Sequence, residues 1–324
     1  MIKDNFDRVH NYLRISLTDR CNLRCFYCMP ENGIELIEKP NIMSLEEIIA
    51  ISKIFISQGV DTIRLTGGEP LIRKNFDFLI KELAKLDINL KLTTNGILLD
   101  RYLDVFREVG LKKINISIDS LDKSKAIFMT KRDFYDKIMK NITLALNNNF
   151  DIKLNIVLIK GVNDNEIIDF IELTRDTKIS IKFIEFMPFK GNEWDKSKCV
   201  TLEEILSITK KHFGDVESLK NPKHSTSINF KAKGFQGNFG IISTVTNPFC
   251  GECNRIRLTA DGKMKNCLFA NKESDLLTPF RRKENIIPVI HQSIRTKKFS
   301  RDGMELKFNE DNYENNRSMT AIGG

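Results

Sequence analysis

Short apolar segments rich in β-branched residues recur along the first 190 residues, and each is followed by a polar or glycine-containing loop. This composition predicts buried β-strands. The six segments are 13–18, 63–67, 90–95, 113–119, 152–159 and 181–187. Between them lie stretches whose apolar residues recur about every 3.6 positions, as in amphipathic helices. Strands that alternate with helices predict a parallel sheet with right-handed crossovers.

The helical stretches include two with clear boundaries, at 44–59 and 134–149. Ser44 and Glu47 form a capping-box pattern at the start of the first, and Gly59 marks its end. Six strands are too few for a complete eight-stranded barrel. A partial barrel and an open doubly wound sheet both remain, and we expect the incomplete (β/α)6 TIM-type barrel.

The pattern changes after Pro188. The later elements are predicted as a helix at 201–213, a strand at 239–245, a hairpin at 255–267 and an amphipathic helix at 284–297. Asp261-Gly262 is the expected hairpin turn. We therefore expect a partial-barrel core at 1–190, a connecting helix and polar stretch at 191–235, and a smaller C-terminal region at 236–324 that ends in Gly323-Gly324.

The composition of the 324 residues is that of a globular protein, with 41% hydrophobic and 29% charged residues. No apolar run approaches the ~18 residues that span a bilayer, and residues 1–8 contain no apolar signal segment. We therefore expect a cytoplasmic protein. The net charge of +8 indicates either a solvated lysine-rich surface or a field that attracts an anion, such as nucleic acid or a phosphorylated small molecule.

Seven cysteines are grouped in a way that favours metal sites over disulfides, because the cytosol keeps thiols reduced. They occur as Cys21, Cys25 and Cys28, as Cys250, Cys253 and Cys267, and as Cys199 alone. Three thiolates within eight residues suit a soft metal, and on a four-iron cube they would leave one iron without a protein ligand. Cysteine-only zinc sites usually have four ligands.

The second cysteine group has the spacing C-x2-C-x13-C. It is either half of a zinc ribbon or a second iron–sulfur site with an open iron, and Cys199 is a candidate fourth ligand that nothing local favours. Arg255 and Arg257 follow at i and i+2 on the predicted strand, so both point to one face. Beside a metal site they suit a phosphate clamp; otherwise they belong to a solvated strand edge. Arg14 and Arg64 would add positive charge to a shared cavity.

The first cysteine triplet, with Tyr27 before its last cysteine, resembles that of the radical S-adenosylmethionine enzymes. A second motif, TGGEP at 66–70, follows the next strand and supports the resemblance. By itself it could be only a turn. In this family, S-adenosylmethionine binds the open iron and yields a 5′-deoxyadenosyl radical. The cofactor therefore supplies the reactive species, and no side chain is expected to act as a general acid or base.

Both cysteine groups, TGGEP, the C-x2-C-R-I-R segment and the terminal Gly-Gly together resemble the GTP 3′,8-cyclases, which begin molybdenum cofactor biosynthesis. The resemblance runs from Arg14 to Gly324. It implies two [4Fe-4S] clusters, the first on Cys21, Cys25 and Cys28 and the second, which holds the substrate, on Cys250, Cys253 and Cys267. The implied contacts to S-adenosylmethionine are Tyr27, Gly68, Ser117 and Met187. The implied contacts to GTP are Arg14, Arg64, Thr93, Lys160, Arg255, the backbone around Ile256, and Arg257.

Two positions depart from the family pattern: Thr62 stands where a lysine is common, and Lys182 where an arginine is common. The resemblance also implies an electron donor, a homodimer, and a downstream cyclic pyranopterin monophosphate synthase, with no nucleic-acid or membrane partner. The Gly-Gly end would reach into the active site; the alternative is a frayed terminus. The other functions considered are a peptide-modifying radical enzyme with an auxiliary cluster and a zinc-stabilised nucleic-acid-binding protein.

Overall fold

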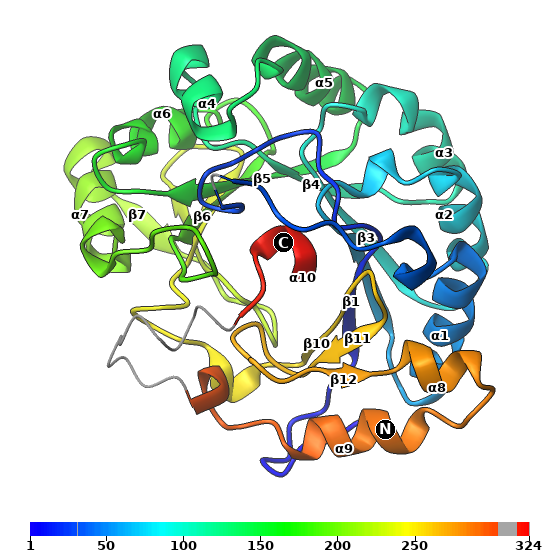
Figure 1. The fold of residues 1–324 in the computed structure, drawn as a ribbon. Coiled ribbons are helices and arrows are strands. Elements are labelled where there is room, and N and C mark those ends of the chain that lie inside the picture. Colours follow the sequence, from blue (N-terminus) through cyan, green and yellow to red (C-terminus); the bar gives the residue numbers. More distant parts are fainter. Residues whose placement is uncertain (31, 304–315, 324) are drawn as a thin grey trace.

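The computed structural model describes residues 1–30, 32–303 and 316–323 as one strongly curved sheet whose outer side is covered by helices (Figure 1). Its first six strands run side by side and parallel. They are β1 (Tyr12–Ser16), β2 (Thr62–Thr66), β3 (Asn89–Thr94), β4 (Lys113–Ser117), β5 (Asp151–Leu158) and β6 (Ser180–Glu185). All six predicted strands are therefore present, in the predicted order.

The helices of the outer layer mostly connect consecutive strands. They are α1 (Leu45–Ser57), α2 (Phe76–Ala84), α3 (Leu103–Glu108), α4 (Lys123–Thr130), α5 (Tyr135–Asn147), α6 (Ile167–Glu172) and α7 (Leu202–Phe213). The helices α8 (Leu277–Arg281) and α9 (Ile287–Arg295) follow β12, whereas α10 (Met319–Ile322) lies inside the ring of strands (Figure 1). The predicted capping box is present: the Glu47 N–H donates to Ser44 Oγ at 3.2 Å, and the Ser44 N–H donates to Glu47 Oε2 at 2.7 Å. Thr201 and Glu204 form a second capping box on α7.

The later strands extend the same sheet at both of its edges. β9 (Asn238–Ile242) pairs parallel to β6, and β10 (Arg255–Leu258) pairs parallel to β1. Antiparallel strands flank them: β7 (Val216–Ser218) and β8 (Ile228–Ala232) at one edge, β11 (Lys263–Lys265) and β12 (Ser274–Asp275) at the other. The fold is the expected incomplete barrel with a C-terminal region, but that region also supplies two strands of the parallel set. Its proposed boundaries at 190 and 236 stay a prediction.

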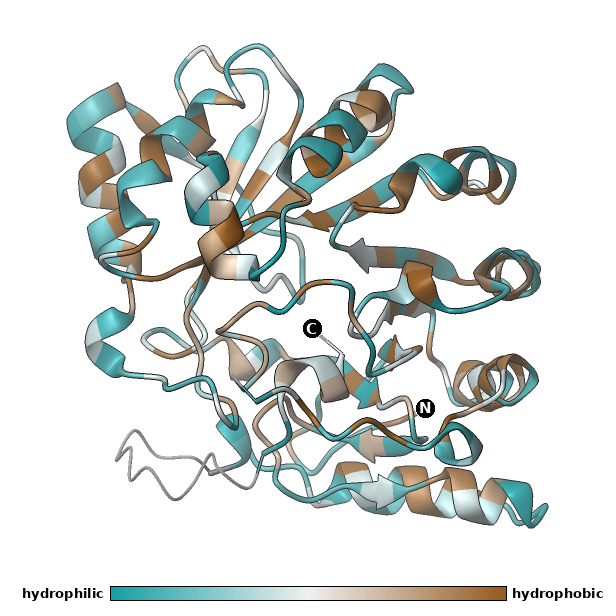
Figure 2. Ribbon diagram, turned by 45° about the horizontal axis from the view of Figure 1, so that its top comes forward, coloured by the Kyte–Doolittle hydropathy of each residue, from teal (hydrophilic) through white to brown (hydrophobic). Residues whose placement is uncertain are grey.

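Hydrophobic and hydrophilic residues alternate along several strands (Figure 2). Because successive side chains of a strand point to opposite faces of the sheet, one face is apolar and the other polar. On β1, Leu13 and Ile15 are fully buried in the apolar core shared with α1, whereas Arg14 lines an internal cavity. Buried parallel strands are usually apolar on both faces. Polar inward positions therefore indicate that this barrel encloses a binding chamber rather than a second core.

The described residues contain no helix that is both long and apolar enough to cross a membrane.

Candidate active site

The first cysteine triplet lies in the loop after β1 and lines a cavity of about 120 Å³. Burial raises the pKa of Cys21 to about 11, and it raises the pKa values of Cys25 and Cys28 further. Buried thiols without a cationic partner keep their protons. A bound iron cluster would replace those protons and supply the missing positive charge, so the donor set fits a soft metal group.

The TGGEP segment fixes this loop rather than merely turning the chain. The Gly68 N–H donates to the Thr18 carbonyl at 2.7 Å, and the Glu69 N–H donates to the Arg20 carbonyl at 2.8 Å. A Cβ on Gly68 would lie 2.2 Å from the Arg20 carbonyl oxygen, so only glycine permits this approach. Gly68 also lines the cavity with the three cysteines, as the prediction for S-adenosylmethionine requires.

Two buried carboxylates beside this cavity were not among the predicted site residues. Glu69 accepts hydrogen bonds from Leu71, Thr94 and Asn95, and burial raises its pKa to about 7. Asp119 accepts from the Tyr27 hydroxyl at 2.6 Å, and burial raises its pKa to about 6. Their signals were present in the sequence, because one belongs to TGGEP and the other follows the β4 strand. Both fix the walls of the cavity.

The second cysteine group lines a larger cavity of about 580 Å³ inside the barrel. Ten cationic side chains and one carboxylate, Asp61, also line it. The cations are Arg14, Arg64, Lys91, Lys153, Lys182, Lys223, Arg255, Arg257, Lys265 and Lys297. Burial raises the pKa of Cys253, but Arg255 and Lys297 outweigh that effect and lower it to about 7. This chamber is therefore built for anions, including thiolates.

Strand register explains why the cations gather. Arg14 on β1 is paired with Arg257 on β10 and with Arg64 on β2, and Arg64 is paired with Lys91 on β3. Four adjacent strands thus carry a cation at the same level of the barrel. Burial together with the nearby Arg255 lowers the pKa of Arg257 to about 10. Like charges opposite each other destabilise a sheet, so the arrangement favours binding of a polyanion.

The two cavities adjoin each other, since Thr93 and Met319 line both. Met319 begins α10, which lies in the mouth of the barrel (Figure 1). Arg257 Nη1 donates to the Gly323 carbonyl. Gly323 has φ +79°, and a Cβ there would lie 2.5 Å from Thr66 Oγ1, so a side chain has no room. The second glycine of the predicted pair, Gly324, lies outside the described residues.

Most residues predicted for GTP are brought together, but not all. Arg14, Arg64, Thr93, Arg255 and Arg257 line the larger cavity. Lys160 lines neither cavity; its side chain is half exposed and pairs with Glu204 at 2.5 Å. The side chain of Ile256 is fully buried in the core, which leaves only its backbone for the predicted contact.

The predicted S-adenosylmethionine residues divide between the cavities. Tyr27, Gly68 and Ser117 line the smaller one, whereas Met187 lines the larger. The remaining cysteine, Cys199, lines neither and packs beside Trp194, with its thiol donating to the Phe186 carbonyl at 3.4 Å. This position offers no support for Cys199 as a cluster ligand.

Within the described residues, no three His, Cys, Asp or Glu side chains converge closely enough to hold a single metal ion. A four-iron cube makes no such demand, because each thiolate binds a different iron. The two cysteine triplets, each lining a cavity, therefore fit a cluster with three protein ligands.

Comparison with protein-family models matches residues 15–174 to the radical SAM superfamily and residues 179–302 to a family described as Molybdenum Cofactor Synthesis C. A protein of Arabidopsis thaliana named GTP 3′,8-cyclase, mitochondrial, is 43% identical over 330 residues, which cover all of this chain and 84% of that protein. The GTP 3′,8-cyclase of Alkaliphilus oremlandii is 40% identical over the full length of both chains.

Other relatives are longer. The human molybdenum cofactor biosynthesis protein 1 is 40% identical over 94% of this chain, which spans only 49% of the human protein. Among solved structures, Streptococcus suis SuiB bound to S-adenosylmethionine matches with a TM-score of 0.60 over 90% of this chain and 68% of SuiB. At 15% sequence identity that likeness concerns the fold alone.

Proposed function

Because the chain belongs to the GTP 3′,8-cyclase family of radical S-adenosylmethionine enzymes, we propose that it catalyses the first step of molybdenum cofactor biosynthesis. When bound, the first cluster and S-adenosylmethionine would supply a 5′-deoxyadenosyl radical that takes hydrogen from C3′ of GTP. The C3′ radical would then bond to C8, and one electron from the electron donor together with one proton would complete 3′,8-cyclo-7,8-dihydro-GTP. Two four-iron clusters are the family's cofactors. The observation that carries the proposal is the layer of cations beside the second cysteine triplet.

The chain's own residues would bind and orient the substrate. Arg14, Arg64 and Arg257, on adjacent strands, present charge to the triphosphate, because guanidinium groups bind phosphate oxygens in pairs. Cys250, Cys253 and Cys267 would hold the second cluster, which would bind the guanine in the same chamber. Thr93 lies where the cavities meet and would adjoin the ribose. The helix α10 lies in the mouth of the barrel and would help to keep water from the substrate (Figure 1).

The same chamber argues against the other functions considered. A nucleic-acid-binding protein needs its cations on an accessible surface, whereas these line an internal cavity of about 580 Å³. A peptide substrate has no need of ten cations and one carboxylate around it. The likeness to SuiB does not revive that alternative, because it shows the fold alone.

Replacing Arg255 with methionine tests the proposal directly. Its guanidinium lines the chamber and stacks on Phe249 at 4.9 Å, and loss of a charged hydrogen bond costs about 1.5–3 kcal/mol. We expect the KM for GTP of the anaerobically reconstituted enzyme to rise about 10- to 100-fold. Lys160→Met removes one charge outside the chamber and should leave KM within about twofold of the unmodified enzyme, within the ordinary scatter of surface changes. Equal effects of both changes, or no GTP-dependent product at all, would refute the proposed site.

A pH dependence follows from Lys182, whose ammonium donates to Asn229 Oδ1. Burial, with the nearby charge of Lys153, lowers the pKa of Lys182 to about 7. The group is thus charged below pH 7 and increasingly neutral above it, while a bound phosphate favours the charged form. GTP affinity should therefore fall as pH rises from 7.5 to 9, by at most tenfold per pH unit. The Lys182→Arg variant stays charged, so its GTP affinity should change less with pH. Isothermal titration calorimetry with GTP measures the affinity of both proteins across this pH range. Parallel pH profiles of the two proteins would show that Lys182 does not contact GTP.

The remaining partners are proposed on chemical grounds. Reductive cleavage of S-adenosylmethionine requires an electron donor, and the cyclised nucleotide requires a further enzyme, which we propose is a cyclic pyranopterin monophosphate synthase. We also propose a homodimer and a cytoplasmic location. The location is a matter for experiment, since the Arabidopsis relative is named as mitochondrial.

A further inference from the structure

A buried lysine stands beside the second cysteine triplet and, within the part of the chain that the structure describes, forms no close ion pair with a carboxylate. Lys297 follows α9, is only 4% exposed, and lines the larger cavity. Its ammonium donates to Cys253 Sγ at 3.7 Å, to the Arg255 carbonyl at 3.4 Å, and to the Asn266 carbonyl. Among the described residues, no ion pair within 4.0 Å joins Lys297 to an acidic side chain; Asp302 interacts with it electrostatically at longer range, and burial raises the pKa of that carboxyl group. A charge buried in this way needs an anion close by.

The three acceptors belong to the segments that carry two of the cysteines. Arg255 follows Cys253, and Asn266 immediately precedes Cys267. The Lys297 ammonium, which has three N–H donors, therefore joins the segment around Cys253 to the segment around Cys267. Asn266 is fixed from its other side, since its Nδ2 donates to the Ser293 carbonyl of α9 at 2.8 Å.

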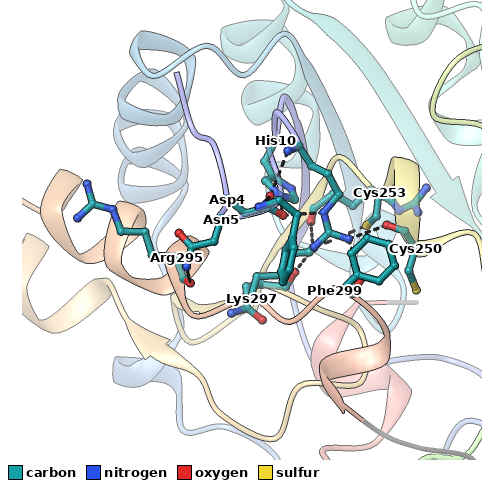
Figure 3. A network of polar contacts seen from close by, with 12 residues as sticks. Asp4, Asn5, His10, Cys250, Cys253, Arg295, Lys297 and Phe299 are labelled. Atoms are coloured by element: carbon teal, nitrogen blue, oxygen red, sulfur yellow. Dashed lines mark hydrogen bonds and ion pairs between the residues drawn. The ribbon is translucent and has the colours of Figure 1, made fainter.

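Cys250, the remaining cysteine of this triplet, is held through its backbone carbonyl by a second buried cation, Arg8, from the start of the chain (Figure 3). Arg8 Nη1 donates to the Cys250 carbonyl at 2.6 Å and to the Phe299 carbonyl at 2.7 Å. Asp4 orients Arg8, with Asp4 Oδ2 accepting from Arg8 Nε at 2.7 Å and lying 3.0 Å from His10 Nε2. Arg8 thus ties Cys250 to the chain segment that also carries Lys297.

We infer that Lys297 is a positioning residue for the second iron–sulfur cluster, with the Asp4–Arg8 pair holding it and Cys250 in place. Its ammonium fixes the two segments around Cys253 and Cys267, and it is the countercharge for the thiolate-bound cluster. Hydrogen bonds and positive charge at cluster sulfurs favour the reduced, more negative state. The inference rests on the proposed function, because it presumes that the second triplet binds a cluster.

The test uses the full chain with Cys21, Cys25 and Cys28 replaced by alanine, so that any iron belongs to the second site. Lys297→Gln is compared with Lys298→Gln, the same change at the exposed neighbouring side chain. Iron loss to a chelator and the midpoint potential from an electron paramagnetic resonance titration are measured. We expect Lys297→Gln to lose iron about tenfold faster and to be reduced about tenfold less favourably, a shift of about 59 mV to more negative potential for one electron. Lys297→Arg should restore both quantities to within about twofold of the parent, because it keeps the charge.

Three results would overturn the inference. The first is equal behaviour of the Lys297→Gln and Lys298→Gln chains. The second is failure of Lys297→Arg to restore the potential. The third is an unfolded Lys297→Gln chain before iron is added, measured by circular dichroism, because the cation would then serve the fold rather than the cluster. A parent chain that binds no iron at all is a different outcome, since it contradicts the proposed second cluster itself.

Discussion

Replacing Cys25 with alanine is expected to abolish cleavage of S-adenosylmethionine. The thiol is partly buried and lines the smaller cavity with the glycines of TGGEP. A four-iron cube with only two protein ligands is held too weakly to persist. Iron should fall from about eight to about four per chain, and 5′-deoxyadenosine should no longer form under anaerobic reduction. Liquid chromatography of the nucleoside and colorimetric iron analysis measure both.

Cys199→Ala is the matched control, because Cys199 is buried but lines neither cavity. That variant should retain about eight irons and normal turnover. Continued 5′-deoxyadenosine formation by Cys25→Ala would contradict the assignment of the first triplet, and loss of iron from Cys199→Ala would show that Cys199 is a ligand after all.

Replacing Cys253 with alanine is expected to separate the two halves of the reaction. The first triplet is untouched, so cleavage of S-adenosylmethionine should continue without coupling to GTP. The cyclised nucleotide should disappear, because the second cluster no longer holds the substrate beside the radical. Misplacement by even 1 Å can cost about 100-fold in rate. Product analysis by mass spectrometry, with 5′-deoxyadenosine measured in the same sample, tests this. Normal cyclisation would refute the substrate-binding role of the second cluster.

Local pattern was enough to predict the six strands and to divide six of the cysteines into two groups, each of which lines one cavity. The six strands have strong apolar signals, and the spacing of Cys21, Cys25 and Cys28 is itself a ligand pattern. The pairing of β9 with β6 and of β10 with β1 could not be predicted in the same way, because edge pairing depends on contacts between distant segments.

The candidate site was predictable only in part, for the same reason. Lys91 alternates with apolar neighbours on β3 and so was detectable as an inward residue, but its position level with Arg64 depends on strand register. Lys160 was expected in the site from the resemblance to the GTP 3′,8-cyclases, yet its side chain pairs with Glu204 on α7. The network of Asp4, Arg8 and Lys297 joins the two ends of the chain and has no local signal.

The short connection between β9 and β10 has a mechanical consequence. These strands lie at opposite edges of the parallel set, which would be about 34 Å apart if the sheet were flat. Residues 243–254 form a turn at 244–246 and a short 3-10 helix at Cys250–Glu252, so they are too compact to span that flat-sheet distance. The connection therefore keeps the two edges of the curved sheet close together. Because Cys250 and Cys253 lie on this connection, a cluster bound to them would be physically linked to the diameter of the barrel.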